Sequence, residues 1–360
     1  MSETSAGLHR PQEFETVLSG SETSVANFEP ERRTALQHAQ QFLHSSPAAV
    51  PLIVLVASLV IFGAIIGGRF FSAFSMTLIL QQVAIVGIVG AAQTLVILTA
   101  GIDLSVGAIM VLSSVVMGQF TFRYGLPPAL AVLCGFAVGA LCGYINGVLV
   151  SVMKLPPFIV TLGTWQIFLA TNFLYSANET IRSQEIGAQA PLLQFFGETF
   201  KIGNAVFTYG VIAMVLLVAL LWYVLNHTAW GRHLHAIGDD PEAAKLSGVR
   251  VRPMLVTVYV LSGLICALAG WCLIGRIGSV SPTAGQFANI ESITAVVIGG
   301  ISLFGGRGSI LGMLFGALIV GVFSLGLRLI GTDPQWTYLL IGALIILAVA
   351  IDQWIRKVAA

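Results

Sequence analysis

The chain has very few charged side chains. Asp, Glu, Lys and Arg together make up 9% of the 360 residues, whereas hydrophobic residues make up 56% and the mean hydropathy is +0.91. An ordinary soluble domain carries about 25% charged residues. A chain of this composition has too few polar groups to cover its own surface in water, so lipid is its natural solvent.

Several motifs are missing, and each absence excludes a class of protein. No basic run is long enough to bind a nucleic-acid backbone. No GxxxxGK[ST] loop is present to bind ATP, and no HExxH or GxSxG motif marks a hydrolase. We therefore expect no catalytic centre, cofactor or metal site, and no nucleic acid as a partner. The cysteines lie in apolar segments without a CxxC pair, which favours a packing role; they are Cys134, Cys142, Cys266 and Cys272.

Long apolar windows recur along the chain, and several approach the roughly 20 residues that cross a bilayer. Backbone amides in lipid must bond within their own segment, which predicts helices. The predicted fold class is therefore all-α: a polytopic membrane protein of about ten transmembrane helices, in which 73–99 and 290–304 fit the pattern least well. The windows are 49–67, 73–99, 104–120, 129–151, 158–175, 206–226, 253–275, 290–304, 309–330 and 335–351.

The first 48 residues are polar and precede the first apolar window, unlike a secretory signal. We interpret 1–48 as a cytoplasmic tail and 49–355 as the transmembrane domain. Basic residues flank the first window, the last window and the segment 227–252. Short loops rich in Lys and Arg stay in the cytoplasm. An even number of spans then places both termini inside and the loop 176–205 outside.

Glycines recur at every fourth position in two places, and such small faces let transmembrane helices approach closely. We favour packing within a bundle over a subunit interface. A short echo between 97–109 and 298–310 also suggests an internal repeat of the kind that many transporters contain. The two glycine stripes are Gly135, Gly139, Gly143 and Gly147, and Gly308, Gly312 and Gly316.

The most distinctive segment is a polar island, residues 227–252, between two apolar windows. Within it, Asp240 predicts an N-cap and Pro241 the first position of a helix. Gly248 predicts the left-handed end of this helix, which runs for about two turns from Pro241 to Ser247.

This short helix presents an apolar surface that needs a cover, formed by Ala243, Ala244 and Leu246. An isolated helix of this length is barely stable in water. We therefore favour docking to a partner over a plain interfacial hairpin between two spans.

Polar residues within the apolar windows are few, and each has two interpretations. Asp103 is either a cap for a helix that begins at Leu104 or a residue of a transport path. The other polar candidates either line that path or form hydrogen bonds between helices; they are Gln81, Gln82, Asn146, Thr164 and Asn172.

Four stretches carry a family resemblance: TLVILTAGIDLSVGAIMVLSS (94–114), GYINGVLVSVMKLPPFIVTLGT (143–164), GRHLHAIGDDPEAAKLSGV (231–249) and PTAGQFANIESITAVVIGGISLFGGRGSILGMLFGALIVG (282–321). They resemble the permease subunits of bacterial ABC importers of monosaccharides, the group that includes the ribose, xylose, arabinose, galactose and fructose systems. The resemblance runs from about residue 70 to the C-terminus and leaves out the N-terminal tail.

The resemblance implies that the island is a cytoplasmic coupling helix and loop that dock on a separate ABC ATPase subunit. It also implies a second permease copy, a periplasmic sugar-binding protein and a bacterial inner membrane. The missing ATP-binding loop is then expected, because ATP is bound by another chain. The residues assigned to coupling are Gly238, Asp239, Glu242, Ala243, Ala244, Leu246 and Gly248.

The leading hypothesis is thus a permease subunit that translocates a monosaccharide, among which we favour fructose or ribose. The alternative is a self-sufficient secondary transporter driven by a proton or ion gradient, with Asp103 at the centre of energy coupling. Uptake by the chain alone under a gradient distinguishes the two. An intramembrane enzyme has no nucleophile–base pair or metal cluster to support it.

Overall fold

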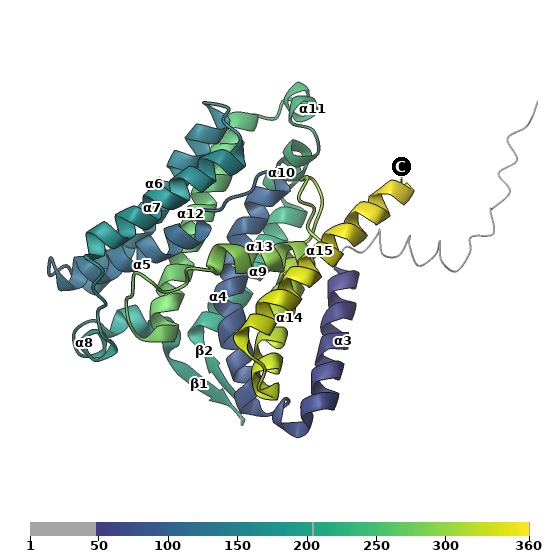
Figure 1. Ribbon diagram of the computed structural model, residues 1–360. Coiled ribbons are helices and arrows are strands. Elements are labelled where there is room, and N and C mark those ends of the chain that lie inside the picture. The colour runs from purple at the N-terminus through teal and green to yellow at the C-terminus, as the bar shows by residue number, and fades with distance from the viewer. Residues whose placement is uncertain (1–47, 204, 360) are drawn as a thin grey trace, which may run out of the picture. The chain divides into compact units, whose positions relative to one another are not determined.

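Helices make up most of the described chain, residues 48–203 and 205–359 of this computed structural model (Figure 1). The predicted tail, 1–48, falls outside these residues apart from Ala48. The α-helices are α3 (Ala49–Ile66), α4 (Ala73–Leu98), α5 (Val106–Phe122), α6 (Pro128–Ser151), α7 (Pro157–Ser176), α8 (Ser183–Gln189), α9 (Tyr209–His227), α10 (Ala229–Asp239), α11 (Pro241–Leu246), α12 (Val251–Ile277), α13 (Ala288–Ile298), α14 (Ile310–Ile330) and α15 (Pro334–Ala359). Two 3₁₀ helices, η1 (Gly67–Arg69) and η2 (Pro191–Gly197), and one antiparallel pair of short strands, β1 (Thr199–Ile202) and β2 (Ala205–Thr208), complete the elements.

Among the residues that the structure describes, seven helices are long and apolar enough to cross a membrane: α3 with η1, α4, α6, α7, α9, α12 and α14. Three shorter apolar segments are α5, α13 and the part 335–347 of α15. Each of the ten predicted windows thus overlaps one α-helix, and the all-α fold class is confirmed. The window 73–99 contains one continuous helix of 26 residues, whereas 290–304 contains most of the 11-residue α13 and then a loop.

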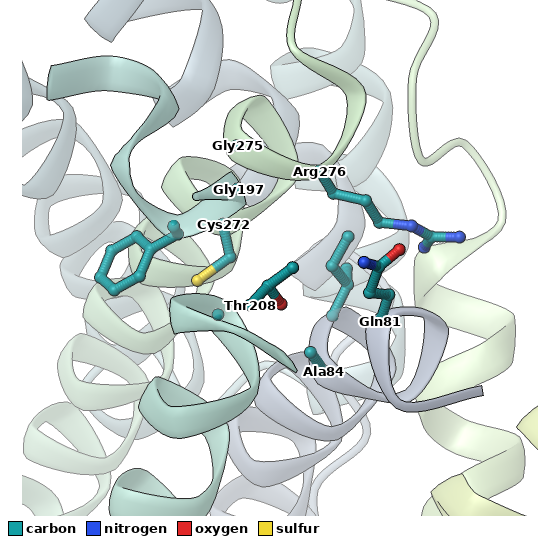
Figure 2. A pocket seen from close by; sticks show the side chains of 10 residues that line it. Gln81, Ala84, Gly197, Thr208, Cys272, Gly275 and Arg276 are labelled. Carbon is teal, nitrogen blue, oxygen red and sulfur yellow. The ribbon is translucent and has the colours of Figure 1, made fainter. Parts of the chain in front are cut away.

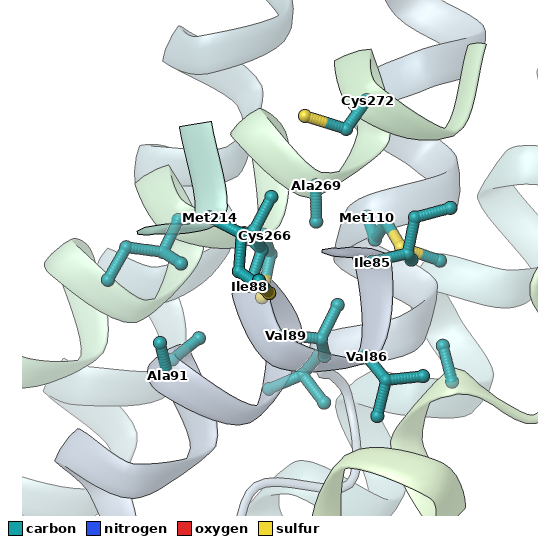
Figure 3. Packing of buried hydrophobic residues seen from close by; sticks show 14 of the residues in the cluster. Ile85, Val86, Ile88, Val89, Ala91, Met110, Met214, Cys266, Ala269 and Cys272 are labelled. Carbon is teal, nitrogen blue, oxygen red and sulfur yellow. The ribbon is translucent and has the colours of Figure 1, made fainter. Parts of the chain in front are cut away.

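Helix α4 forms the centre of the bundle. Every residue from Val83 to Leu98 is buried, which is the expected state of a helix that is apolar on all sides. Figure 3 shows α4 side chains such as Ile88 and Val89 beside Met110 of α5, Met214 of α9 and Cys266 of α12. All four cysteines are free thiols, and Cys266 and Cys272 take part in this packing.

The helices form two groups of four that repeat the same set of contacts. Helix α4 packs against α12, and each of the two also packs against the third helix of the other group: α4 against α14, and α12 against α6. Within the groups, α5 contacts α6 and α7 just as α13 contacts α14 and α15. The internal repeat is therefore α4–α7 with α12–α15, a longer unit than the predicted echo.

The predicted echo between 97–109 and 298–310 is instead a shared way of ending a helix. At the end of α4, Ala100 is left-handed (φ 60°) and the Gly101 amide donates to the Val96 carbonyl (3.1 Å). At the end of α13, Gly300 is left-handed (φ 74°) and the Ile301 amide donates to Val296 (3.2 Å). Both ends satisfy carbonyls that the helix leaves unpaired.

The two ends of the bundle differ. Helices α10 and α11 lie at one end, while α8 and the β1–β2 hairpin lie at the other (Figure 1). In the hairpin, Phe200 is paired with Phe207, and Phe195 of η2 stacks on Tyr209 with ring centroids 5.0 Å apart. Aromatic side chains are common where a membrane protein meets the membrane–water interface.

The glycine stripes pack inside the chain, as predicted. A Cβ atom at Gly143 would lie 2.1 Å from the Tyr259 carbonyl oxygen of α12, and one at Gly316 would lie 2.0 Å from the Ala295 oxygen of α13. One member was wrongly assigned: Gly308 lies in the loop before α14, with φ 143°, and belongs to no helix face. The close approach of α6 to α12 therefore requires glycine.

We expect Gly143→Ala to destabilise the protein, because its methyl group meets backbone that cannot move without separating α6 from α12. Overpacking of this kind typically costs about 1–3 kcal/mol. Gly163→Ala in α7 is the matched control: nothing lies within 4 Å of a Cβ there, and alanine is favoured over glycine within a helix. Thermal unfolding of the two variants in nanodiscs measures the difference. Equal melting temperatures would contradict this account of the stripe.

Candidate functional site

The polar island 227–252 holds two helices rather than the one predicted. Helix α9 ends at His227, and α10 begins directly after Thr228, whose hydroxyl accepts from the Gly231 amide (3.3 Å). Helix α10 is amphipathic: Leu234 and Ile237 are buried, while Arg232, His233 and Asp239 are exposed. The cap residue Thr228 and the spacing of these apolar residues are the signals that would have revealed α10 in the sequence.

The second helix, α11, has the predicted caps. The Asp240 carboxylate accepts from the amides of Glu242 (2.9 Å) and Ala243 (3.1 Å), and Pro241 occupies the first turn. At the other end, Gly248 is left-handed (φ 89°) and its amide donates to the Lys245 carbonyl. The helix ends at Leu246, one residue before the predicted Ser247. These caps give a fixed shape to a helix that is too short to be stable by itself.

The apolar side chains of α11 divide between two faces, which corrects the predicted surface. Ala244 is buried and does not belong to the exposed face. Leu246 is 89% exposed, an unusual state for a leucine, and Ala243 and Glu242 are exposed beside it. Glu242 and Lys245 approach to 3.9 Å, but both side chains are well exposed and their pairing contributes little to stability. Every residue of α11 except Ala244 is therefore exposed, and Ala243 and Leu246 are the apolar part of this surface beside Glu242.

Helix α10 ties α11 to the core of the bundle through backbone contacts. A Cβ atom at Gly238 would lie 1.8 Å from the Leu98 carbonyl oxygen and 2.5 Å from the Gly306 nitrogen. The Gly306 amide itself donates to the Leu98 oxygen (3.0 Å), and His235 Nδ1 donates to the Gly306 carbonyl (3.0 Å). The end of α10 thus meets the end of α4 and the loop before α14 at one point. Asp239 follows Gly238 and packs against Gly306.

Asp103 is buried and has internal partners. Its Oδ1 accepts from the Ser105 amide (2.7 Å) and the Ser105 hydroxyl (2.6 Å), a turn typical of aspartate before a helix. Helix α5 begins at Val106, two residues later than predicted, so Asp103 shapes the connection rather than capping a helix at Leu104. Asn146 of α6 donates to the same Ser105 hydroxyl (2.8 Å). This arrangement favours a structural role for Asp103.

The other polar candidates do not form a single site. Thr164 bonds within α7 to the Thr161 carbonyl (3.4 Å), and Asn172 donates to the Pro282 carbonyl (2.8 Å). The Asn172 bond ties α7 to the segment before α13, whereas the Thr164 bond lies within α7 itself. Gln81 and Gln82 lie on α4 toward the end opposite α11, and Arg276 of α12 donates to the Gln82 side chain.

A small cavity of about 50 Å³ lies beside Gln81 and Arg276 (Figure 2). It is enclosed by α4, α12 and the start of α9, with Thr208 and Cys272 in its wall. This volume admits a few water molecules and is smaller than a monosaccharide. Among the described residues, no group of three or more His, Cys, Asp or Glu side chains is placed to hold a metal ion.

Comparison with known proteins identifies the family. Residues 75–349 match the model of a family described as the permease component of branched-chain amino acid transport systems. The chain is 80% identical to the fructose import permease of Rhizobium meliloti over 360 residues, which is all of both chains. It is 40% identical to the ribose import permease of Bacillus subtilis, covering 82% of this chain and 89% of the relative.

A third relative is the galactose/methyl galactoside import permease of Escherichia coli, which is 34% identical over 87% of this chain and 95% of the relative. No solved structure matches the chain. These relatives are transport subunits and not enzymes, and the apolar helices make this chain a multi-pass membrane protein. Because the family model covers most of the chain and the relatives match over most of their own lengths, the chain belongs to this family of import permeases, as its four motif stretches predicted.

Proposed function

We propose that this chain is the subunit of an ATP-driven importer through which fructose crosses the bacterial inner membrane. The identity of 80% over the full length to a fructose import permease supports fructose over ribose, whose permease is 40% identical. ATP is bound and hydrolysed by a separate cytoplasmic ABC subunit, and a periplasmic binding protein delivers the sugar. The chain itself needs no cofactor.

The observation that carries the coupling role is the exposed surface of α11. A leucine that is 89% exposed on a rigidly capped helix marks a site of contact with another protein. Behind it, α10 touches the end of α4 and the loop before α14, so a push on α11 reaches two helices of the bundle core. We propose that the ATPase subunit moves α11 together with α10 and thereby shifts the permease between outward and inward openings.

The basic residues near α10 and α11 indicate how the chain is oriented in the membrane. Arg232 and Lys245 lie on α10 and α11, and Arg250 and Arg252 lie at the start of α12 that follows, which supports a cytoplasmic location for this end. The C-terminal end of α15 lies toward the same end of the bundle as α11 (Figure 1). We propose that both termini are cytoplasmic and that α8, η2 and the hairpin face the periplasm.

We further propose that the permease works as a pair of identical copies. Helix α7 exposes Gln166 and Thr171 in its middle turns, whereas α3 and α9 expose apolar side chains in theirs. Gly163 on α7 and Gly342 on α15 have no atom within 4 Å of a Cβ position. Polar and small residues on an outer helix face are typical of helix–helix contact in membranes, and these faces suit a second copy.

The first test is reconstitution. Liposomes that contain this chain, its ATPase and the binding protein are expected to take up labelled fructose when ATP is supplied, and to take up little ribose. The chain alone, under a proton or sodium gradient and without ATPase, is expected to move no sugar. Uptake under the gradient alone would instead show a secondary transporter, and a preference for ribose would overturn the choice of fructose.

Leu246→Arg is expected to prevent binding of the ATPase subunit, because it places a charge at the centre of an apolar contact. The residue is almost fully exposed, so the permease itself should fold normally. Co-purification of the ATPase and ATP-driven uptake should both fall by at least about tenfold, which corresponds to 1.4 kcal/mol or more. Leu192→Arg at the opposite end is the control and should retain ATPase binding. Normal binding by Leu246→Arg would remove α11 from the interface.

Gly238→Ala tests transmission rather than docking. Its methyl group displaces α10 from the Leu98 and Gly306 backbones, while the exposed residues of α11 are unchanged. We expect the ATPase to bind and hydrolyse ATP, and fructose uptake per ATP to fall severalfold. The measurement is uptake and hydrolysis in the same vesicles, with Gly68→Ala as the neutral control, because nothing lies within 4 Å of a Cβ atom there. An unchanged ratio would mean that this contact transmits nothing.

A further inference from the structure

The 3₁₀ helix η2 lies against the C-terminal end of α12 and is held there by side chains of both segments. The Trp271 indole Nε1 donates to the Leu192 carbonyl (3.1 Å), and Gln194 Nε2 donates to the Gly278 carbonyl (2.6 Å). Gly278 is the left-handed residue that ends α12 (φ 77°). The Phe196 ring meets the Trp271 ring edge-on, with centroids 4.7 Å apart. These contacts fix η2 on the last turns of α12.

Backbone also packs directly on backbone between η2 and α12. A Cβ atom at Gly197 would overlap the Gly275 carbonyl group, and a Cβ atom at Gly275 would overlap the Gly197 nitrogen. A side chain at either position would therefore separate the two segments. Because closely packed backbone leaves no free space between them, η2 and the end of α12 move as one unit.

The strands that follow η2 attach the same segment to α4. The Thr77 hydroxyl, near the start of α4, donates to the Val206 carbonyl of β2 (2.8 Å). Strands β1 and β2 are paired along all four residues of each, so β2 is held to the chain that continues from η2. We call η2, β1 and β2 together the outer strap, residues 191–203 and 205–208. The outer strap thus joins the end of α12 to the start of α4.

The outer strap bridges a gap in the packing between α4 and α12. The cavity of about 50 Å³ lies between these two helices, and residues of the strap form part of its wall (Figure 2); they are Phe196, Gly197 and Thr208. Across the gap, the two helices are connected by the strap and by the hydrogen bond from Arg276 to the Gln82 side chain. Since an empty space transmits no displacement, a movement of one helix reaches the other here through these connections.

Helix α4 is held at both of its ends. Near its start it carries the Thr77 bond to the outer strap, and at its other end the Leu98 carbonyl lies against Gly238 of α10. A protein that binds one position of the strap better than another must therefore also favour one position of α4. By linkage, it then changes the equilibrium of whatever is bound at α10 and α11.

We propose that the outer strap relays the docking of the sugar-loaded binding protein to α4 and α12, and through α4 to α10 and α11, so that the ATPase subunit hydrolyses ATP faster when sugar has been delivered. Trp271 and Gln194 are positioning residues of this relay, because their hydrogen bonds hold the strap on α12. The inference rests on the proposed function and adds to it a route from the periplasmic face to the ATPase subunit.

The test measures ATP hydrolysis by the reconstituted permease–ATPase complex with and without fructose-loaded binding protein. Trp271→Phe keeps an aromatic ring and removes the donor to Leu192, and Gln194→Ala removes the donor to Gly278. In each variant, stimulation by the loaded binding protein is expected to fall by about fivefold, the effect of losing one hydrogen bond of typical strength. Hydrolysis without the binding protein should be retained.

Two control variants make similar changes outside the strap. Trp222→Phe is the same substitution on α9, where the indole ring contacts the His227 ring instead. Gln189→Ala removes an exposed glutamine of α8, at the same end of the bundle as Gln194. Both controls should keep full stimulation.

A second measurement separates relay from docking. The affinity of the loaded binding protein for the nucleotide-free complex in nanodiscs should be the same for the variants and the unmodified protein. Equal stimulation in variants and controls would overturn the relay, and so would a loss of affinity, which indicates a docking surface instead. A parallel fall of hydrolysis with and without the binding protein would overturn it too, because that result indicates a structural role.

The unmodified complex distinguishes failure of the relay from failure of the proposed function. If it imports fructose with ATP but its hydrolysis is not stimulated by the loaded binding protein, the relay is wrong and the importer stands. If it imports no fructose with ATP, the proposed function is wrong, and this inference with it.

Discussion

The structure depends on a contact between backbones at Gly238. There the end of α10 lies directly against the last carbonyl of α4 and the loop before α14, with no space for a side chain. Hydrogen bonds from Gly306 and His235 close the same junction. Because three segments share one point, α10 cannot shift without moving the most buried helix of the bundle. A rigid joint of this kind transmits a displacement that flexible side chains would absorb.

The internal repeat explains how the backbone contact at Gly238 is connected to the whole bundle. Helices α4 and α12 pack against each other at its centre, and each also holds a helix of the other group. The short helices α5 and α13 begin next to each other, since a Cβ at Gly107 would lie 3.1 Å from the Asn289 nitrogen and Asn289 donates to the Leu104 carbonyl (3.4 Å). A movement of α4 against α14 at one end of the bundle is therefore transmitted to the point inside the membrane where α5 and α13 begin.

Much of the fold was predictable because lipid allows few alternatives. Apolar windows must be helices in a membrane, and all ten coincide with helices. The caps of α11 were predictable because Asp240, Pro241 and Gly248 act locally. What could not be read from the sequence depends on the direction of side chains: Ala244 turns inward and Leu246 outward, although both are apolar. The repeat α4–α7 with α12–α15 was also hidden, because it is preserved in contacts and not in residues.

The exposure of Leu246 has a consequence for the life of the protein in the cell. Under the coupling role proposed above, a permease that has been inserted without its ATPase subunit leaves Leu246 uncovered on the surface of α11. In the proposed assembly, the ATPase subunit covers this side chain. Under that proposal, unassembled copies differ from assembled ones in this one exposed leucine, and the supply of the ATPase subunit sets how many permease copies keep it exposed.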